Sequence, residues 1–193
     1  RVNGTTTSPT VPCGSLTKVI VNADASSQRI DGRGLDVAAF SAKPHLEVAS
    51  SSGQDFVWDT AQADSIATGA GNDFITIQRK TPNTSVLGGT DSDTLEFVGT
   101  AADESITVQS PSGTTVTITD TDDATTVVHV GQQIEKVRVS ARDGADFVSS
   151  SGIALASAVD TVFLDGEGGD DVLAAGAGGA YLDGGAGKTT FTG

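Results

Sequence analysis

The chain has 193 residues, enough for one domain with a substantial core, and carries a formal net charge of −14. Its 11 Lys and Arg are scattered, so the negative field disfavours nucleic-acid binding, and no apolar run is long enough to span a membrane. Asp outnumbers Glu by 20 to 5, with 24 Gly and no Met, and such a composition favours turns and strands over long helices.

The first 16 residues are polar and contain Pro9 and Pro12. We expect residues 1–16 to form an extended N-terminal arm that is either disordered or docked as a strand on another subunit. Because the chain begins at Arg1 and contains no Met, we expect a processed product or an excised piece that has lost its signal peptide. The single cysteine, Cys13, has no internal partner; it is either an idle thiol or pairs with another chain.

Beyond this arm, aspartates followed by apolar residues recur at nearly constant spacing. One set is separated by 19, 18 and 20 residues: Asp36, Asp55, Asp73 and Asp93. A second set lies about halfway between members of the first: Asp64 and Asp103. A coil with about 18–20 residues and two strands per turn would stack the two sets along opposite edges. We therefore predict that residues 17–193 form an all-β, mostly parallel β-solenoid, a β-roll or right-handed β-helix.

The clearest loop of this coil is TGAGNDFIT at residues 68–76, where Gly69 and Gly71 precede Asp73. Residues 166–192 contain three similar nonapeptides without a gap: GEGGDDVLA, AGAGGAYLD and GGAGKTTFT. Glycines allow positive φ and close approach of carbonyl groups, and aspartate supplies a hard anionic oxygen. Both segments resemble the repeats-in-toxin (RTX, or haemolysin-type) family of calcium-binding β-rolls.

The resemblance implies that calcium binds between adjacent turns through the sixth residue of each nonapeptide. Asp171 keeps this ligand, whereas Ala180 and Thr189 replace it. The Ca²⁺ ligands that we expect, completed by loop carbonyls, are six aspartates: Asp55, Asp73, Asp91, Asp93, Asp146 and Asp171. The alternative is that Gly and Asp recur here only because tight turns favour them.

Strand alternation predicts which side chains face the core. The inward set is Val57, Ile66, Ile75, Leu95, Phe97 and Ile106. Phe56, Trp58 and Phe74 face outward and are expected to form an interface unless the arm or a loop covers them. Because Phe56 and Phe74 are equivalent on adjacent turns, they should stack about 4.8 Å apart.

After Thr114 the Gly-Asp loops disappear, and strands with alternating apolar residues remain. Val116 and Ile118 should face inward on the first of these strands. The sequence PSG at 111–113 indicates a hairpin turn and hence a local antiparallel excursion from the parallel coil. The loop register resumes at Asp146.

No catalytic motif accompanies His45 or His129, so we predict that the protein is not an enzyme. The favoured function is an extracellular or cell-surface structural protein: a calcium-stabilised solenoid of a surface layer, fibre or adhesin. It would self-associate head to tail or laterally, or bind other surface proteins. The alternative is a carbohydrate-active β-helix enzyme, such as a polysaccharide lyase or epimerase, or the non-catalytic RTX segment of a secreted enzyme.

Overall fold

Nearly all regular structure in this protein is β-strand. The computed structural model describes residues 13–36, 40–41, 43–79, 83–111, 113–121, 126–155 and 157–193. Two short 3-10 helices, η1 (Cys13–Ser15) and η2 (Arg33–Asp36), accompany the strands. The strands are β1 (Lys18–Asn22), β2 (Arg29–Asp31), β3 (His45–Ala49), β4 (Phe56–Trp58), β5 (Ser65–Ala70), β6 (Phe74–Gln78), β7 (Ser85–Thr90), β8 (Thr94–Val98), β9 (Ser105–Ser110), β10 (Thr115–Thr121), β11 (Thr126–Gln132), β12 (Lys136–Ser140), β13 (Phe147–Ile153), β14 (Thr161–Asp165), β15 (Val172–Ala174), β16 (Tyr181–Asp183) and β17 (Thr190–Thr192).

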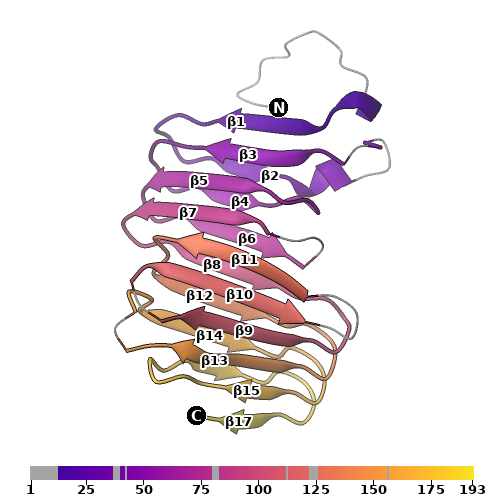
Figure 1. Ribbon diagram of the computed structural model, residues 1–193, viewed down its shortest axis with the longest axis vertical. Coiled ribbons are helices and arrows are strands. Elements are labelled where there is room, and N and C mark those ends of the chain that lie inside the picture. The colour runs from indigo at the N-terminus through magenta and orange to yellow at the C-terminus, as the bar shows by residue number, and fades with distance from the viewer. Residues whose placement is uncertain are drawn as a thin grey trace.

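The strands form two sheets stacked face to face, and the chain alternates between them (Figure 1). The ten-stranded sheet has the order β1-β3-β5-β7-β11-β10-β9-β13-β15-β17, and the seven-stranded sheet has the order β16-β14-β12-β8-β6-β4-β2. Equivalent residues on adjacent rungs pair in parallel: Phe56 pairs with Phe74, and Phe74 with Thr94. The prediction of an all-β, mostly parallel solenoid is confirmed.

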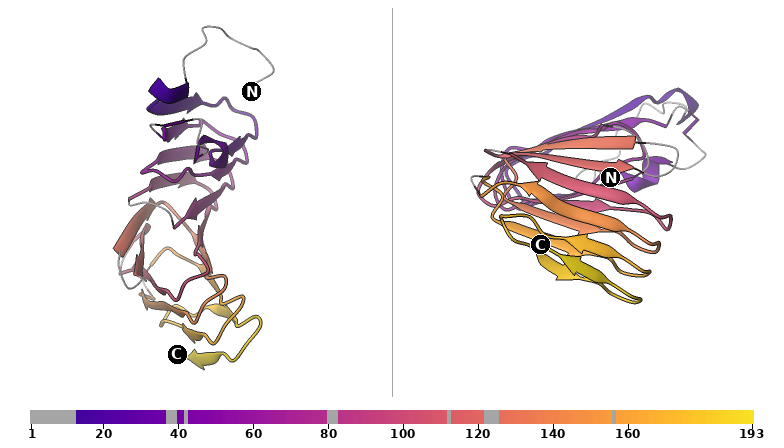
Figure 2. Two further views of the ribbon diagram at one scale, coloured as in Figure 1. Left: turned by 90° about the vertical axis from the view of Figure 1, so that its right-hand side faces the viewer. Right: turned by 60° about the horizontal axis from the view of Figure 1, so that its bottom comes forward.

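One antiparallel excursion interrupts the coil, as the turn at 111–113 predicted. Strand β10 runs antiparallel to both β9 and β11, and β11 pairs in parallel with β7. In the other sheet β8 and β12 are direct neighbours. The ten-stranded sheet thus gains two strands, roughly 10 Å of width at the usual strand spacing, on one side of the core only. Figure 2 shows the rungs spreading apart there.

The core is a continuous apolar column between the sheets. All residues predicted to face inward are buried: Val57, Ile66, Ile75, Leu95, Phe97, Ile106, Val116 and Ile118. The alternation of buried and exposed residues along β8 and β10 produces this column, because successive side chains of a strand point to opposite faces. The strand pattern therefore determines which face of each sheet is free for function.

The predicted N-terminal arm falls mostly outside the described part of the chain. Residues 1–12 are not among the described residues, nor is the side chain of Cys13. The first rung begins at Lys18. Within the described ranges, no helix combines the length and the apolar character needed to cross a membrane.

Candidate functional site

A first column of aspartates lies along the edge where the chain enters the seven-stranded sheet. Asp55, Asp73 and Asp93 immediately precede β4, β6 and β8, and each is at most 2% exposed. Their Oδ1 atoms accept hydrogen bonds from the backbone N–H groups of Gln28 (2.8 Å), Asp55 (2.7 Å) and Asp73 (2.9 Å). The N–H of Asp93 in turn donates to Oε2 of Glu135 at 2.9 Å. Each carboxylate thus links its own rung to the preceding one.

A second column follows the opposite edge, where the chain enters the ten-stranded sheet. Oδ1 of Asp146 accepts a hydrogen bond from the N–H of Glu104 at 2.8 Å, and Oδ1 of Asp171 accepts one from the N–H of Asp146 at 3.0 Å. Thr189 takes the corresponding place before β17, and its hydroxyl donates to the carbonyl oxygen of Gly184 at 3.2 Å. The two columns therefore share one hydrogen-bonding pattern.

Glycine is needed in these turns because successive loops nest against each other. Gly71 and Gly169 have φ angles of 128° and 138°, in the left-handed region. A Cβ at Gly71 would collide with the carbonyl group of Gly53, and one at Gly169 with that of Gly144. The glycines therefore permit the close stacking that brings each aspartate within reach of the neighbouring rung.

The predicted position of Asp36 is wrong, whereas Asp103 lies on the predicted edge, one residue before the buried position of the column. Gln28, not Asp36, lies beside Asp55, because Asp36 belongs to η2 in the longer connection after β2. Glu104, one residue after Asp103, occupies the second column. Asp64 is on the second edge as predicted, where its Oδ1 accepts a hydrogen bond from the N–H of Leu46 at 2.6 Å.

The six predicted calcium ligands separate into two groups on opposite edges and one outlier. Asp91 is exposed and lies in a turn with a φ of 84°. The other five are buried, and their Oδ2 atoms have no hydrogen-bond partner among the described residues: Asp55, Asp73, Asp93, Asp146 and Asp171. A buried carboxylate oxygen without a partner is unfavourable, so the columns combine a satisfied structural oxygen with an unsatisfied one.

Burial changes the acidity of both columns. It raises the pKa of Asp93 to about 7, assisted by the negative charges of Asp73, Glu135 and Asp91. It also raises the pKa of Asp146 to about 7, assisted by neighbouring acidic groups that include Glu104 and Asp171. Burial is also the main reason that the pKa of Asp73 is raised. The ionised form of these carboxyl groups is therefore unfavourable unless a cation lies beside them.

Carboxylate oxygens are the kind of ligand that a hard cation such as Ca²⁺ takes, together with carbonyl and water oxygens. No three Asp, Glu, His or Cys side chains of the described residues converge as a metal centre. A hollow of about 390 Å³ nevertheless opens beside the second column, and Asp103, Glu104, Asp146 and Asp170 are among its lining residues. The Oδ2 atom of Asp146 is itself buried and has no hydrogen-bond partner among the described residues. Ca²⁺ takes six to eight oxygen ligands in flexible geometry, so few carboxylates are needed for each ion.

The predicted aromatic interface lies on the outer face of the seven-stranded sheet. Phe56 and Phe74 stack with their ring centroids 6.4 Å apart and their planes at 28°, so the stacking is confirmed at a wider spacing than expected. The guanidinium groups of Arg29 and Arg33 lie 4.5 and 5.1 Å from the ring centroid of Trp58. The role of these rings as an interface stays a prediction.

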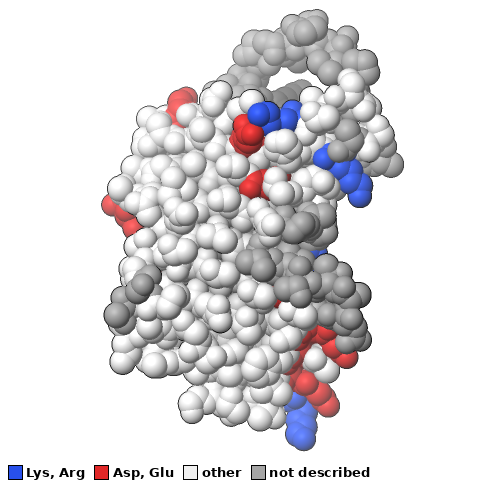
Figure 3. All heavy atoms as spheres, in the orientation of Figure 1, with Lys and Arg blue, Asp and Glu red and all other residues white. Residues whose placement is uncertain are grey.

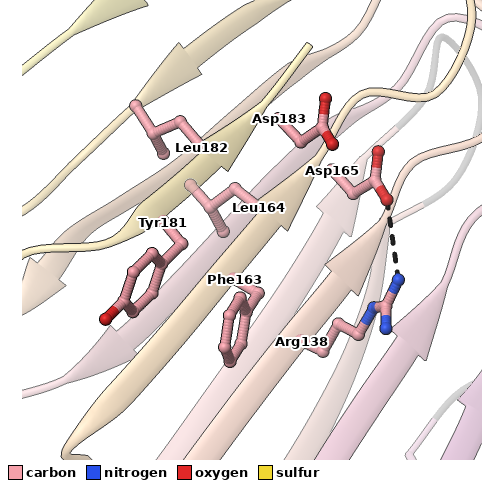
Figure 4. A pocket seen from close by; sticks show the side chains of 7 residues that line it. All are labelled: Arg138, Phe163, Leu164, Asp165, Tyr181, Leu182 and Asp183. Atoms are coloured by element: carbon pink, nitrogen blue, oxygen red, sulfur yellow. Dashed lines mark ion pairs between the residues drawn. The ribbon is translucent and has the colours of Figure 1, made fainter. Parts of the chain in front are cut away.

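A second aromatic stack on this sheet was not predicted. Phe163 and Tyr181 stack with their centroids 5.0 Å apart and their planes at 17°. They line a hollow of about 320 Å³ together with Arg138, Asp165 and Asp183 (Figure 4). Nη2 of Arg138 lies 3.6 Å from Oδ2 of Asp165. A search for like residues one 18-residue turn apart would have found both the aromatic and the acidic pair.

A buried charged cluster beneath the antiparallel excursion was also missed. Arg79 forms an ion pair with Asp120, and its Nε lies 3.7 Å from Oε1 of Glu104. Nearby on β11, His129 is buried with its ring centroid 5.6 Å from that of Phe97, and burial lowers the pKa of His129 to about 4. The inward orientation of Asp120 could have been predicted, because this residue continues the alternation of Val116 and Ile118.

The two histidines lie in different surroundings. His129 is in the core, and His45 is on the outer face of the ten-stranded sheet, where its Nε2 lies 3.6 Å from Oε1 of Glu47. Comparison with known proteins gives no assignment either: no protein-family model, curated protein or solved structure matches this chain.

Proposed function

We propose that this chain is a calcium-stabilised β-solenoid module of an extracellular or cell-surface structural protein. One observation carries the proposal: five aspartates lie buried in two columns, and each keeps an Oδ2 atom without a partner. The Gly-Asp turns that resemble RTX repeats occupy the same edges. No second function has comparable support from the described residues.

Repulsion within each column is the physical reason for a cation. Successive rungs are about 4.8 Å apart, so ionised carboxylates on adjacent rungs face like charges at short range and without water. Burial and this repulsion raise the pKa of Asp93 and of Asp146 to about 7. A divalent cation between two rungs would replace the repulsion with attraction and supply a partner for the Oδ2 atoms.

The second column offers the more accessible place for such an ion. Its hollow is open to solvent beside Asp146, and exposed Asp103 and Asp170 lie among the lining residues. In our proposal Asp146 and Asp171 hold the ion from two successive rungs, and loop carbonyls and water complete its shell. Asp73 and Asp93 would act in the same way in the first column.

Thermal unfolding with Ca²⁺ and with a chelator tests the ion. Saturating a site a hundredfold above its Kd adds about 2.7 kcal/mol of stability, which for a chain of this size raises the Tm by roughly 5–10 °C. We expect this rise for the wild type and a smaller one for Asp146→Asn, which keeps the Oδ1 acceptor but lacks the charge. Asp24→Asn is the control, because Asp24 is exposed and its carboxylate bonds, among the described residues, only to Ser26 and Gln28 of its own loop.

Isothermal titration calorimetry and electron microscopy complete the test. We expect calcium binding to the wild type and weaker binding to Asp146→Asn, and regularly spaced particles or fibres that dissolve in chelator. A Tm that neither Ca²⁺ nor chelator changes, together with no heat of binding, would show that the aspartates have only the backbone-bonding role.

A further inference from the structure

The outer face of the ten-stranded sheet differs in charge from the rest of the molecule. From β5 to β17 the described outward side chains are uncharged and mostly small: Ser65, Ala67, Ser85, Leu87, Val130, Gln132, Thr115, Thr117, Thr119, Thr121, Ser105, Thr107, Gln109, Phe147, Ser151, Val172, Ala174, Thr190 and Thr192. Among the described residues of this sheet, charged side chains face outward only on β1 and β3, where Lys18 and Glu47 form an ion pair. Figure 3 shows a broad face without charge, with acidic and basic residues at its margins.

This neutrality contrasts with the composition of the chain. Charged residues make up 19% of the sequence, and the net charge is −14. The outer face of the seven-stranded sheet follows that composition, since Glu96, Arg138 and Asp165 form ion pairs across it. Among the described residues, charged side chains are therefore absent from the outer face of the ten-stranded sheet between β5 and β17.

Two copies of a chain with this charge repel each other wherever their acidic surfaces meet. The uncharged face is the exception, because two such faces can approach without bringing like charges together. It also carries apolar anchors on either side of the β10–β11 hairpin: Leu87 is 40% and Phe147 is 41% exposed. A second copy of the chain is thus the partner whose charge pattern matches this face.

The size of the face agrees with a stable dimer. Eight strands span β5 to β17 in the sheet order. With strands about 4.8 Å apart and residues about 3.3 Å apart, the face covers roughly 600–700 Å². Two such faces in contact would bury about 1,200–1,400 Å² in total, which is within the range of specific interfaces.

We propose that the outer face of the ten-stranded sheet, from β5 to β17, is the interface through which two copies associate face to face. A two-fold axis in the plane of the interface makes the contact isologous and closed. Two sheets with the same twist pack with their strands at about −30°, and Ser, Thr and Ala side chains allow them to approach to the usual separation of about 10 Å.

Sedimentation velocity over a range of concentrations tests the dimer, with Ca²⁺ and with chelator. Thr107 lies at the centre of the face on β9, paired with Thr119 and Ser149. In Thr107→Glu the two-fold axis brings two buried negative charges near each other, so we expect the dimer Kd to rise at least about tenfold. Thr94→Glu is the matched control on the outer face of the seven-stranded sheet, where we expect an unchanged Kd. Circular dichroism and Tm verify that both variants fold.

The salt dependence supplies a second readout. Because net repulsion is the main electrostatic contribution, the wild-type dimer should tighten as salt is raised from low to physiological concentration and above. A wild type that stays monomeric at every concentration overturns the proposal, even if the face then binds a different partner. A dimer that Thr107→Glu leaves intact, or that both variants weaken equally, overturns it as well.

Discussion

At the scale of single residues, the two oxygens of each column aspartate have different roles. Oδ1 of Asp73 or Asp171 accepts a backbone hydrogen bond from the neighbouring rung, whereas Oδ2 is buried without a partner. Asparagine can reproduce the first role but not the anionic character of the second. Variants with asparagine therefore separate the contribution of the hydrogen bond from that of the charge.

The raised pKa values predict how stability depends on pH when metal is removed. Asp93 and Asp146 have folded pKa values of about 7, above the value of about 3.9 for an unfolded chain. The folded state thus binds more protons at these two groups between these limits, so their contribution to the free energy of unfolding is largest below pH 4 and falls as pH rises to 7. His129, with its pKa lowered to about 4, opposes this trend below pH 6.5, but it is one group against two.

Urea denaturation in chelator at pH 5 and pH 8 measures the effect. We expect a lower midpoint at pH 8 in the wild type and a smaller difference in the double variant Asp93→Asn/Asp146→Asn. A midpoint that rises from pH 5 to pH 8 in the wild type would contradict the raised pKa values.

Much of this residue-level arrangement was predictable from the sequence. Alternation identified the buried side chains, and spacing placed Asp55, Asp73 and Asp93 in one column. The position of Gln28, rather than Asp36, beside Asp55 was not predictable, because the length of an irregular connection such as that containing η2 follows no period. The partners of each Oδ1 atom also could not be predicted, since they depend on the exact nesting of the turns.

At the scale of the elements, nested glycine turns fix the distance between rungs. Gly169 is in the left-handed region, and its Cα packs against the carbonyl group of Gly144 on the preceding rung. Gly187 makes the same contact with Gly169 one rung later. The turns therefore leave no room for a side chain at these positions.

We expect Gly169→Ala to destabilise the fold by about 2 kcal/mol or more, because a methyl group adds both a backbone collision and φ strain. Gly34→Ala is the control, since a Cβ at Gly34 meets nothing within 4 Å and needs no left-handed φ. Chemical denaturation of both variants gives the two free energies. Equal stability of Gly169→Ala and the wild type would mean that the turns do not nest as described.

The elements themselves were predictable where periodicity was strong. The nonapeptides at 166–192 correspond to β15, β16 and β17, and the hairpin turn after β9 was expected. The return of β11 to pair with β7 was not expected, because a turn signal gives the place of a reversal but not the strand that receives the chain afterwards. The ion pair between Arg79 and Asp120 follows from that pairing and was missed with it.

At the scale of the whole molecule, the hairpin is an insertion into an otherwise regular coil. Hydrogen-bonded column residues are between 18 and 27 residues apart on rungs without the hairpin, but Asp93 and Glu135 are 42 apart, as are Glu104 and Asp146. Gln133 follows β11 with a positive φ of 52°, just as Asp91 follows β7 with a φ of 84°. The turn into β12 is thus an ordinary turn of the solenoid.

Removal of residues 111–132 should therefore leave a foldable chain. The deletion shortens both long intervals to the 20 residues of an ordinary rung and joins Ser110 directly to the turn at Gln133. We expect a β-sheet circular-dichroism spectrum and a cooperative transition at lower stability, because two core-facing strands are lost. An unfolded product would contradict this, whereas Gly169→Ala within the shortened chain should again destabilise it.

The neutral face also belongs to this scale, and it could not be predicted from the sequence. Whether a residue of β9, β10 or β13 faces outward beside another depends on the register across the antiparallel pair. Composition alone gives the net charge of −14 but not the faces on which the charged side chains lie. Only the assembled sheet shows that the charge is distributed unevenly.

The direction of the chain in the excursion limits how such a molecule can grow. Strand β9 runs with the coil, β10 against it and β11 with it again, so the polypeptide leaves at the same edge at which an uninterrupted rung would leave. Extra strands can consequently be added only in even numbers, since a single extra strand would end at the opposite edge from the one where the next turn begins. Homologous modules of different width should therefore differ by whole hairpins. The connection from β9 through β10 to β11 is the place where a longer antiparallel ribbon could be inserted without disturbing the rungs that follow.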